Sequence, residues 1–129
     1  MQKSIIETFP SADISLYIVW INRLKGDSKD VADQVAKKFV QDSRVIHYYD
    51  PEQRLGHTLT KSLSGIEAEA AWDIYLFYDQ GKTWERLPPS PDEYMHQMTK
   101  SGWADPAQFY TGNDLVNKLV SVMNNFIDP

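Results

Sequence analysis

The chain has 129 residues, 42% of them hydrophobic and 24% charged, which is enough apolar material for one folded domain and argues against a disordered chain. A net charge of −5 without a stripe of Lys and Arg argues against nucleic-acid binding, and an acidic surface argues against binding to anionic membranes. Because there is no cysteine, disulfides, thiol catalysis and cysteine-ligated metals are excluded.

The N-terminal residues show no targeting signal. Apolar residues in the range 1–10 are too sparse for a signal peptide, and no apolar run reaches the length of a membrane span. A cytoplasmic location is therefore expected.

A run of mostly apolar residues, Ile14–Ile21, predicts the first strand, buried on both faces as in a parallel sheet covered by helices. A polar connection with Gly26 follows, and Asp27 or Ser28 is expected to cap the next helix. The apolar residues of that helix recur at helical spacing: Val31, Val35, Ala36, Phe39 and Val40.

Residues Arg44–Asp50 predict a second strand that runs directly into a helix start. Asp50 occupies the N-cap position of this expected helix and Pro51 its first position. The helix then continues to Ser64-Gly65, with three leucines on one face: Leu55, Leu59 and Leu63.

Residues Trp72–Asp79 predict a third strand, and a turn at 79–82 returns the chain into a fourth strand over 83–87. A capping box at 90–93 predicts a short helix over 92–98, and 101–110 is expected to be irregular. The last helix is amphipathic and capped by Thr111 or Asn113. Its apolar residues are Leu115, Val116, Leu119, Val120, Val122, Met123 and Phe126.

This order of elements, β-α-β-α-β-β-α, resembles the thioredoxin family over roughly residues 12–127. Three segments carry the resemblance: Tyr17–Trp20, like the family's first core strand, Val45–Asp50, like its strand that ends in Asp, and Trp72–Lys82, like its hairpin. The resemblance implies a single thioredoxin-like domain over residues 1–129. It implies an α/β fold of three layers, α/β/α, around a mixed sheet of about four strands.

The redox site of that family is missing. Leu24-Lys25-Gly26-Asp27 occupies the place of the Cys-x-x-Cys motif, and Ala71 or Trp72 occupies the place of the cis-proline. Thiol–disulfide exchange by this chain is therefore excluded on chemical grounds.

In this topology the first loop, the end of the second strand and the start of the third meet at one edge, where helix N-termini favour anions. This edge is the candidate binding site. A simpler explanation of the same residues is that Asp50 caps its helix, that Arg23 and Lys25 are solvated, and that Trp72 packs on the core. The candidates are Arg23, Lys25, Asp27, Asp50, Arg54, Trp72 and Asp73.

Two functional hypotheses follow. The first is a redox-inactive module that binds a protein or peptide, with no nucleic acid, membrane or cofactor involved. The aromatic residues near the Pro-rich connection are either anchors or a contact surface: Trp84, Tyr94, Trp103, Phe109 and Tyr110. The second is a small enzyme using Asp50, His57 and the first-loop cations. The three histidines, His47, His57 and His96, show no metal-ligand spacing.

Overall fold

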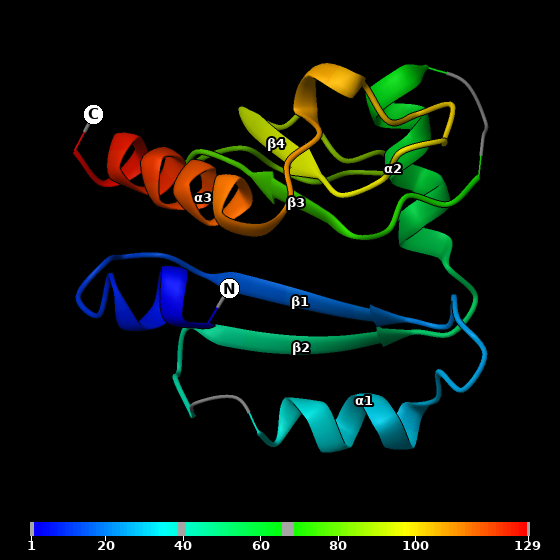
Figure 1. The fold of residues 1–129 in the computed structure, drawn as a ribbon, viewed down its shortest axis with the longest axis horizontal. Coiled ribbons are helices and arrows are strands. Elements are labelled where there is room, and N and C mark those ends of the chain that lie inside the picture. The colour runs from blue at the N-terminus through cyan, green and yellow to red at the C-terminus, as the bar shows by residue number, and fades with distance from the viewer. Residues whose placement is uncertain (1, 39–40, 66–68, 129) are drawn as a thin grey trace. The chain divides into compact units, whose positions relative to one another are not determined.

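The computed structural model describes residues 2–38, 41–65 and 69–128, and Figure 1 shows their fold. Contacts divide the chain into two compact units, Met1–Gln53 (unit 1) and Arg54–Pro129 (unit 2), and each is described by itself. The order β-α-β-α-β-β-α is confirmed. The expected single sheet of four strands is wrong, because the strands form two separate sheets of two strands each. No described helix has the length and apolar character needed to cross a membrane.

Unit 1 consists of a π-helical turn, a parallel strand pair and one helix. The elements are η1 (Gln2–Glu7), β1 (Leu16–Ile21), α1 (Lys29–Ala36) and β2 (Val45–Asp50). Strands β1 and β2 pair in parallel with Leu16 opposite Val45 and Ile21 opposite Asp50, so α1 lies in the crossover between them (Figure 1). Both expected strands of this unit are thus confirmed.

The two faces of the β1–β2 sheet differ in exposure. Ile18 is buried, whereas Tyr17 and Tyr48 on the other face are 58% and 54% exposed, with ring centroids 6.3 Å apart. The expectation that the first strand is buried on both faces is therefore wrong. A pair of strands needs cover on only one side, unlike the centre of a larger parallel sheet.

Helix α1 begins as expected. The Ser28 hydroxyl accepts a hydrogen bond from the Val31 N–H at 3.2 Å, which confirms it as the N-cap. The apolar face is narrower than its sequence predicts, since Ala32 is buried while Val31 is 45% exposed. Phe39 and Val40, assigned to the same face, lie outside the described residues.

An arginine ties the N-terminal segment to the start of β2. The Arg44 guanidinium donates to both carboxylate oxygens of Asp42, at 2.9 and 2.7 Å. It also donates to the carbonyl oxygens of Ile6, Phe9 and Ala12, at 3.3, 2.7 and 3.3 Å. The hydrogen bonds from Arg44 lower the pKa of Asp42 to about 2. This fork of donors joins the segment 6–12 to the residue that precedes β2.

Unit 2 places a strand pair between two helices. Its elements are α2 (Arg54–Ser64), β3 (Ile74–Phe77), β4 (Glu93–His96), η2 (Pro106–Gln108) and α3 (Gly112–Ile127). Strands β3 and β4 are antiparallel, with Ile74 opposite His96. Ile74 and Leu76 pack in the cluster around Leu59 of α2, whereas the ring of Phe77 lies 5.8 Å from that of Phe126 in α3. Figure 1 shows these elements of unit 2.

Helix α2 begins later than its sequence predicts. Its first residue is Arg54, while Asp50 is the last residue of β2 and therefore is not the N-cap of this helix. The intervening chain turns, with the Gln53 N–H bonded to the Asp50 carbonyl at 3.3 Å and Gln53 at φ 57°. A left-handed residue stops a helix from extending back through it, so Pro51 belongs to the turn. The end at Ser64-Gly65 is confirmed, with Gly65 at φ 72°.

The second strand of the hairpin lies further along the chain than expected. Residues 83–87 are not a strand, and the expected helix over 92–98 is wrong because Glu93–His96 is β4. The Asp92 N–H donates to the Phe77 carbonyl at 2.9 Å, next to the ladder of β3 and β4. Pairing with β3 satisfies the backbone groups that the capping box would have served.

The core of unit 2 is apolar and closely packed. Leu59, Ala71 and Trp103 form its buried centre, and Leu55 and Leu63 pack against them as their spacing predicts. A Cβ atom on Gly56 would lie 2.6 Å from the Ala71 carbonyl oxygen and 2.9 Å from the Ala70 Cβ. The Ala71 N–H also donates to the Gly56 carbonyl at 3.0 Å, so only glycine allows this close approach.

One histidine is built into this core. His96 is fully buried, its Nδ1 accepts from the Met98 N–H at 3.1 Å, and its Nε2 lies 2.8 Å from the Asp105 carbonyl oxygen. A carbonyl oxygen only accepts, so Nε2 carries the proton of the neutral ring. The Trp103 ring meets His96 edge-on with centroids 5.3 Å apart. Both ring nitrogens are satisfied, and His96 is a structural residue.

Candidate binding surface

Residues 79–92, here called the 79–92 loop, connect β3 to β4 and are held at their base by Asp92. Its carboxylate accepts from the Asp79 N–H at 2.8 Å and pairs with the Lys82 ammonium at 2.6 Å. The Lys82 hydrogen bond, followed by that of the Asp79 N–H, lowers the pKa of Asp92. Lys82 also donates to the Ser90 carbonyl at 2.9 Å, so both ends of the loop meet at one ion pair.

The loop is held at a second point by α2. The Ser62 hydroxyl donates to the carbonyl oxygen of Pro88 at 2.9 Å, and Pro88 is buried. The turn at 79–82 forms as its sequence predicts, with a hydrogen bond from the Lys82 N–H to the Asp79 carbonyl and Gly81 at φ 92°. Residues 83–87 are therefore an exposed segment, held on one side by Lys82 and on the other by Pro88. This segment is called the projecting part of the loop.

Two large apolar side chains are exposed in this projecting part. Trp84 is 46% exposed and Leu87 is 52% exposed. The Trp84 ring packs edge-on against Tyr78, with centroids 5.3 Å apart, and this contact restricts the orientation of the indole. The Tyr78 hydroxyl is buried without a hydrogen-bond partner among the described residues. Burial, with a smaller contribution from Asp92, raises the pKa of Tyr78 to about 12.

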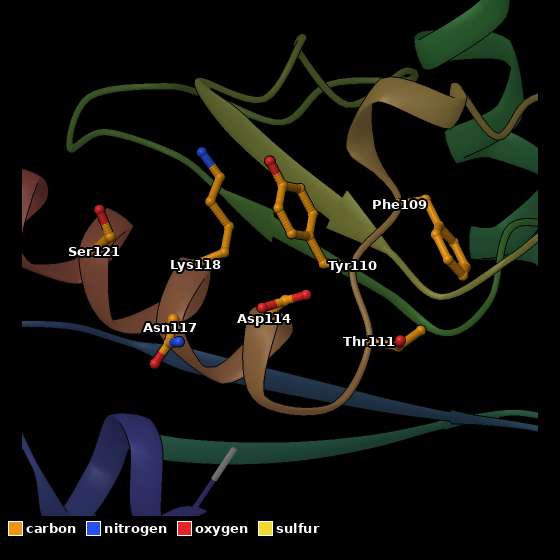
Figure 2. Close-up of a pocket in the computed structure, with 7 residues that line it drawn as sticks. All are labelled: Phe109, Tyr110, Thr111, Asp114, Asn117, Lys118 and Ser121. Atoms are coloured by element: carbon orange, nitrogen blue, oxygen red, sulfur yellow. The ribbon is translucent and has the colours of Figure 1, made fainter.

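A shallow depression lies on a different part of unit 2, along the first half of α3 (Figure 2). Its volume is about 510 Å³, and five of its seven lining residues are exposed. It is lined by Phe109, Tyr110, Thr111, Asp114, Asn117, Lys118 and Ser121. An open depression of this kind does not exclude water, as a catalytic pocket usually does.

Four residues of the site predicted from sequence belong to unit 1. Arg23, Lys25 and Asp27 follow β1, and Asp50 ends β2 opposite Ile21, so the parallel register brings them to the same end of the sheet. The Asp27 carboxylate accepts from the N–H groups of Leu24 and Arg23, at 2.6 and 2.8 Å, and these bonds lower its pKa. Asp27 thus closes its own loop, which is a structural role.

The other three predicted residues belong to unit 2 and have separate places in it. Arg54 opens α2, Trp72 is half-buried, and Asp73 lies just before β3 with φ 53°. The Asp73 carboxylate accepts from the Gln97 side-chain amide at 2.9 Å, and its carbonyl accepts from the Gln97 N–H at 3.1 Å. Asp73 therefore orients the end of the hairpin.

The other two histidines, His47 and His57, belong to different units. The Trp20 indole N–H donates to Nδ1 of His47 at 3.0 Å, and His57 lies on the exposed side of α2 in unit 2 while Asp50 belongs to unit 1. Within the described ranges, no cluster of His, Asp or Glu has the geometry of a metal site. The hypothesis of an enzyme using Asp50 and His57 stays a prediction.

The aromatic residues near the Pro-rich connection divide between the two roles considered for them. Trp103 is an anchor, 3% exposed, whereas Trp84 lies on the surface. The pairing of Lys82 with Asp92 was not predictable from local residues, because that contact depends on β4 lying at 93–96. The available signal was the polar turn followed by three prolines, which predicts a long connection and no return strand.

Comparison with known proteins identifies no relative. No family, curated protein or solved structure is significantly similar to this chain. The geometry of the chain itself is therefore the basis for any assignment of function.

Proposed function

We propose that this protein is a redox-inactive, protein-binding module whose contact surface is the projecting part of the 79–92 loop. The observation that carries the proposal is the exposure of Trp84 and Leu87, at 46% and 52%, on a loop with fixed ends. Tryptophan is strongly enriched among the residues that dominate binding energy at protein interfaces. Isolated exposed apolar side chains are common, but two on one projecting loop form a candidate contact.

The fixed ends of the loop favour binding. An unconstrained loop loses conformational entropy when a partner orders it, which weakens the complex. Here the Lys82–Asp92 ion pair and the Ser62–Pro88 hydrogen bond hold the loop before any partner arrives. The contact of Trp84 with Tyr78 restricts the indole in the same way.

We also propose that the chain is a cysteine-free relative of the thioredoxin family. The support is the order β-α-β-α-β-β-α and the parallel β-α-β arrangement of unit 1. Without any cysteine in the 129 residues, such a relative retains no thiol chemistry, which agrees with a binding role.

The binding proposal is tested by selecting peptides from a random display library on the immobilised protein and measuring their affinities for purified variants. Trp84→Ala and Leu87→Ala are expected to weaken binding by at least about tenfold each, as hot-spot residues do. Asp92→Ala leaves both contact side chains in place but releases the base of the loop, and a smaller loss is expected. Circular dichroism verifies that each variant is folded.

Two control variants locate the contact. Val116→Ala removes an apolar side chain that is 40% exposed on α3, and it should leave the affinities unchanged. Tyr17→Ala removes the most exposed tyrosine of the β1–β2 sheet, at 58%. If Tyr17→Ala abolishes binding while Trp84→Ala has no effect, the contact surface is the sheet of unit 1 and the proposal is wrong.

A further inference from the structure

The depression along α3 collects polar side chains that the fold does not use. In the part of the chain that the structure describes, the side chains of Thr111, Asp114, Asn117 and Ser121 make no hydrogen bond or ion pair. Thr111 is the N-cap of α3 by its backbone angles, yet its hydroxyl does not cap the helix. Two hydroxyls, one amide and one carboxylate therefore remain available between the N-cap of α3 and Ser121 (Figure 2).

The charges in the depression disfavour a strongly anionic ligand. Lys118 is the lining residue with a positive charge, and its ammonium lies 3.5 Å from the Glu93 carboxylate and 5.9 Å from the centre of the Tyr110 ring. Glu93 offsets much of that charge, and Asp114 adds a negative charge within the first turn of α3. Phosphate esters, which need an excess of positive charge, do not match this set.

One aromatic ring faces these polar groups. Tyr110 is half-buried with its ring beside Lys118, whereas the Phe109 ring points away from the α3 side chains, and its centroid lies 6.2 Å from that of His96 (Figure 2). An aromatic ring next to uncommitted donors and acceptors suits a ligand with an apolar face and a rim of hydroxyl groups. Each hydroxyl both donates and accepts, so it can pair with a carboxylate, an amide or another hydroxyl.

We infer that the depression binds a neutral carbohydrate. The C–H face of the sugar ring lies against Tyr110, and its hydroxyls bond to Asp114, Asn117 and Ser121. The volume of about 510 Å³ falls within the range of roughly 300–1,000 Å³ of small-molecule sites. Because the depression is open, binding is weak and suited to one or two rings of a longer glycan. This site is separate from the 79–92 loop, and neither proposal depends on the other.

The test is a titration of the ¹⁵N-labelled full chain, followed by NMR, with glucose, N-acetylglucosamine, maltose and cellobiose. We expect saturable shift changes in the millimolar range, confined to the amides of residues 109–121, with at least one of these sugars. Asn117→Ala and Asp114→Asn are each expected to weaken that binding by about tenfold, the effect of removing a hydrogen bond. Asn124→Ala, an exposed asparagine of the same helix outside the depression, is the matched control and should leave the affinity unchanged.

Three results would overturn the inference. One is the absence of shift changes with all four sugars at tens of millimolar. Another is binding that Asn117→Ala and Asn124→Ala affect equally, because the contact is then not in the depression. The third is a response to inorganic phosphate alone at the same amides, which would show that the site selects anions.

Discussion

The two units are stabilised by different kinds of interaction. Unit 2 contains a buried apolar cluster of Leu59, Ala71 and Trp103, each at most 4% exposed. Among the described residues of unit 1, the buried hydrophobic ones are Ile5, Ile6, Ile18 and Ala32, and Arg44 adds bonds to Asp42 and to three backbone carbonyls. A parallel pair of strands with one face exposed buries little apolar area, so directional polar bonds carry more of its stability.

The strongest test of the apolar unit is Gly56→Ala. The new methyl group would meet the Ala71 carbonyl at 2.6 Å, and backbone at that point has little room to move. We expect a loss of about 3 kcal/mol in the free energy of unfolding, measured by urea denaturation. Gly102→Ala is the control, because no atom lies within 4 Å of its added Cβ, and it should be close to neutral. Equal effects of the two variants would mean that α2 and Ala71 are not closely packed.

His96→Leu tests the polar part of the same core. The substitution leaves the Met98 N–H and the Asp105 carbonyl without their partner in a site that is fully buried. We expect a loss of about 2–3 kcal/mol by the same measurement. Asn125→Leu, at an exposed position of α3, should change stability by less than about 0.5 kcal/mol. A neutral His96→Leu would show that apolar packing alone holds this core.

Ser28→Ala tests how much one polar bond contributes in unit 1. The hydroxyl bond to the Val31 N–H caps a helix of only 8 residues, so its loss should reduce stability by about 1 kcal/mol. Hydrogen exchange in α1 is the direct readout, and it should accelerate there. Ser28→Asp should retain most of the protection, because aspartate caps as well as serine.

The smallest effect is expected in acid, at the ion pair of unit 1. The pKa of Asp42 is lowered to about 2 in the folded protein, so the unfolded chain takes up this proton first as the pH falls. The contribution of the Asp42–Arg44 pair is therefore complete above about pH 4 and is lost as the pH falls toward about 2. Hydrogen exchange at 5–12 and in β2 should accelerate over this range, and Asp42→Asn should remove the pH dependence. Unchanged acid sensitivity in Asp42→Asn would assign it to another carboxylate.

Local signals in the sequence identified most elements correctly. The apolar run before Asn22, the Ser28 cap, the leucine spacing of α2 and its end at Gly65 depend on neighbouring residues, and all are confirmed. The β4 strand was mistaken for a helix, because the capping box of Ser90 to Glu93 is a valid local signal that pairing with β3 overrides. Likewise Pro51 suits the first turn of a helix, but the left-handed Gln53 puts it in a turn.

The candidate surfaces were harder to predict than the fold. The aromatic residues near the prolines indicate the region of the proposed contact surface, yet sequence alone did not separate the exposed Trp84 from the buried Trp103. The ion pair of Lys82 with Asp92 joins residues ten positions apart, and it forms only because the hairpin returns at Glu93. In the sequence, the α3 residues that line the depression form the polar face of an amphipathic helix. An ordinary solvated face has the same pattern, so the pattern does not indicate a binding site.

The uneven exposure of the tryptophans gives the protein an internal optical probe. Of its four indoles, Trp103 is buried, Trp20 and Trp72 are half-buried, and Trp84 is the exposed one. A neutral quencher such as acrylamide reaches an exposed indole first, so the quenchable, red-shifted part of the emission reports on the 79–92 loop. Shielding of that emission by an added partner would reveal contact with the loop in unlabelled, unmodified protein.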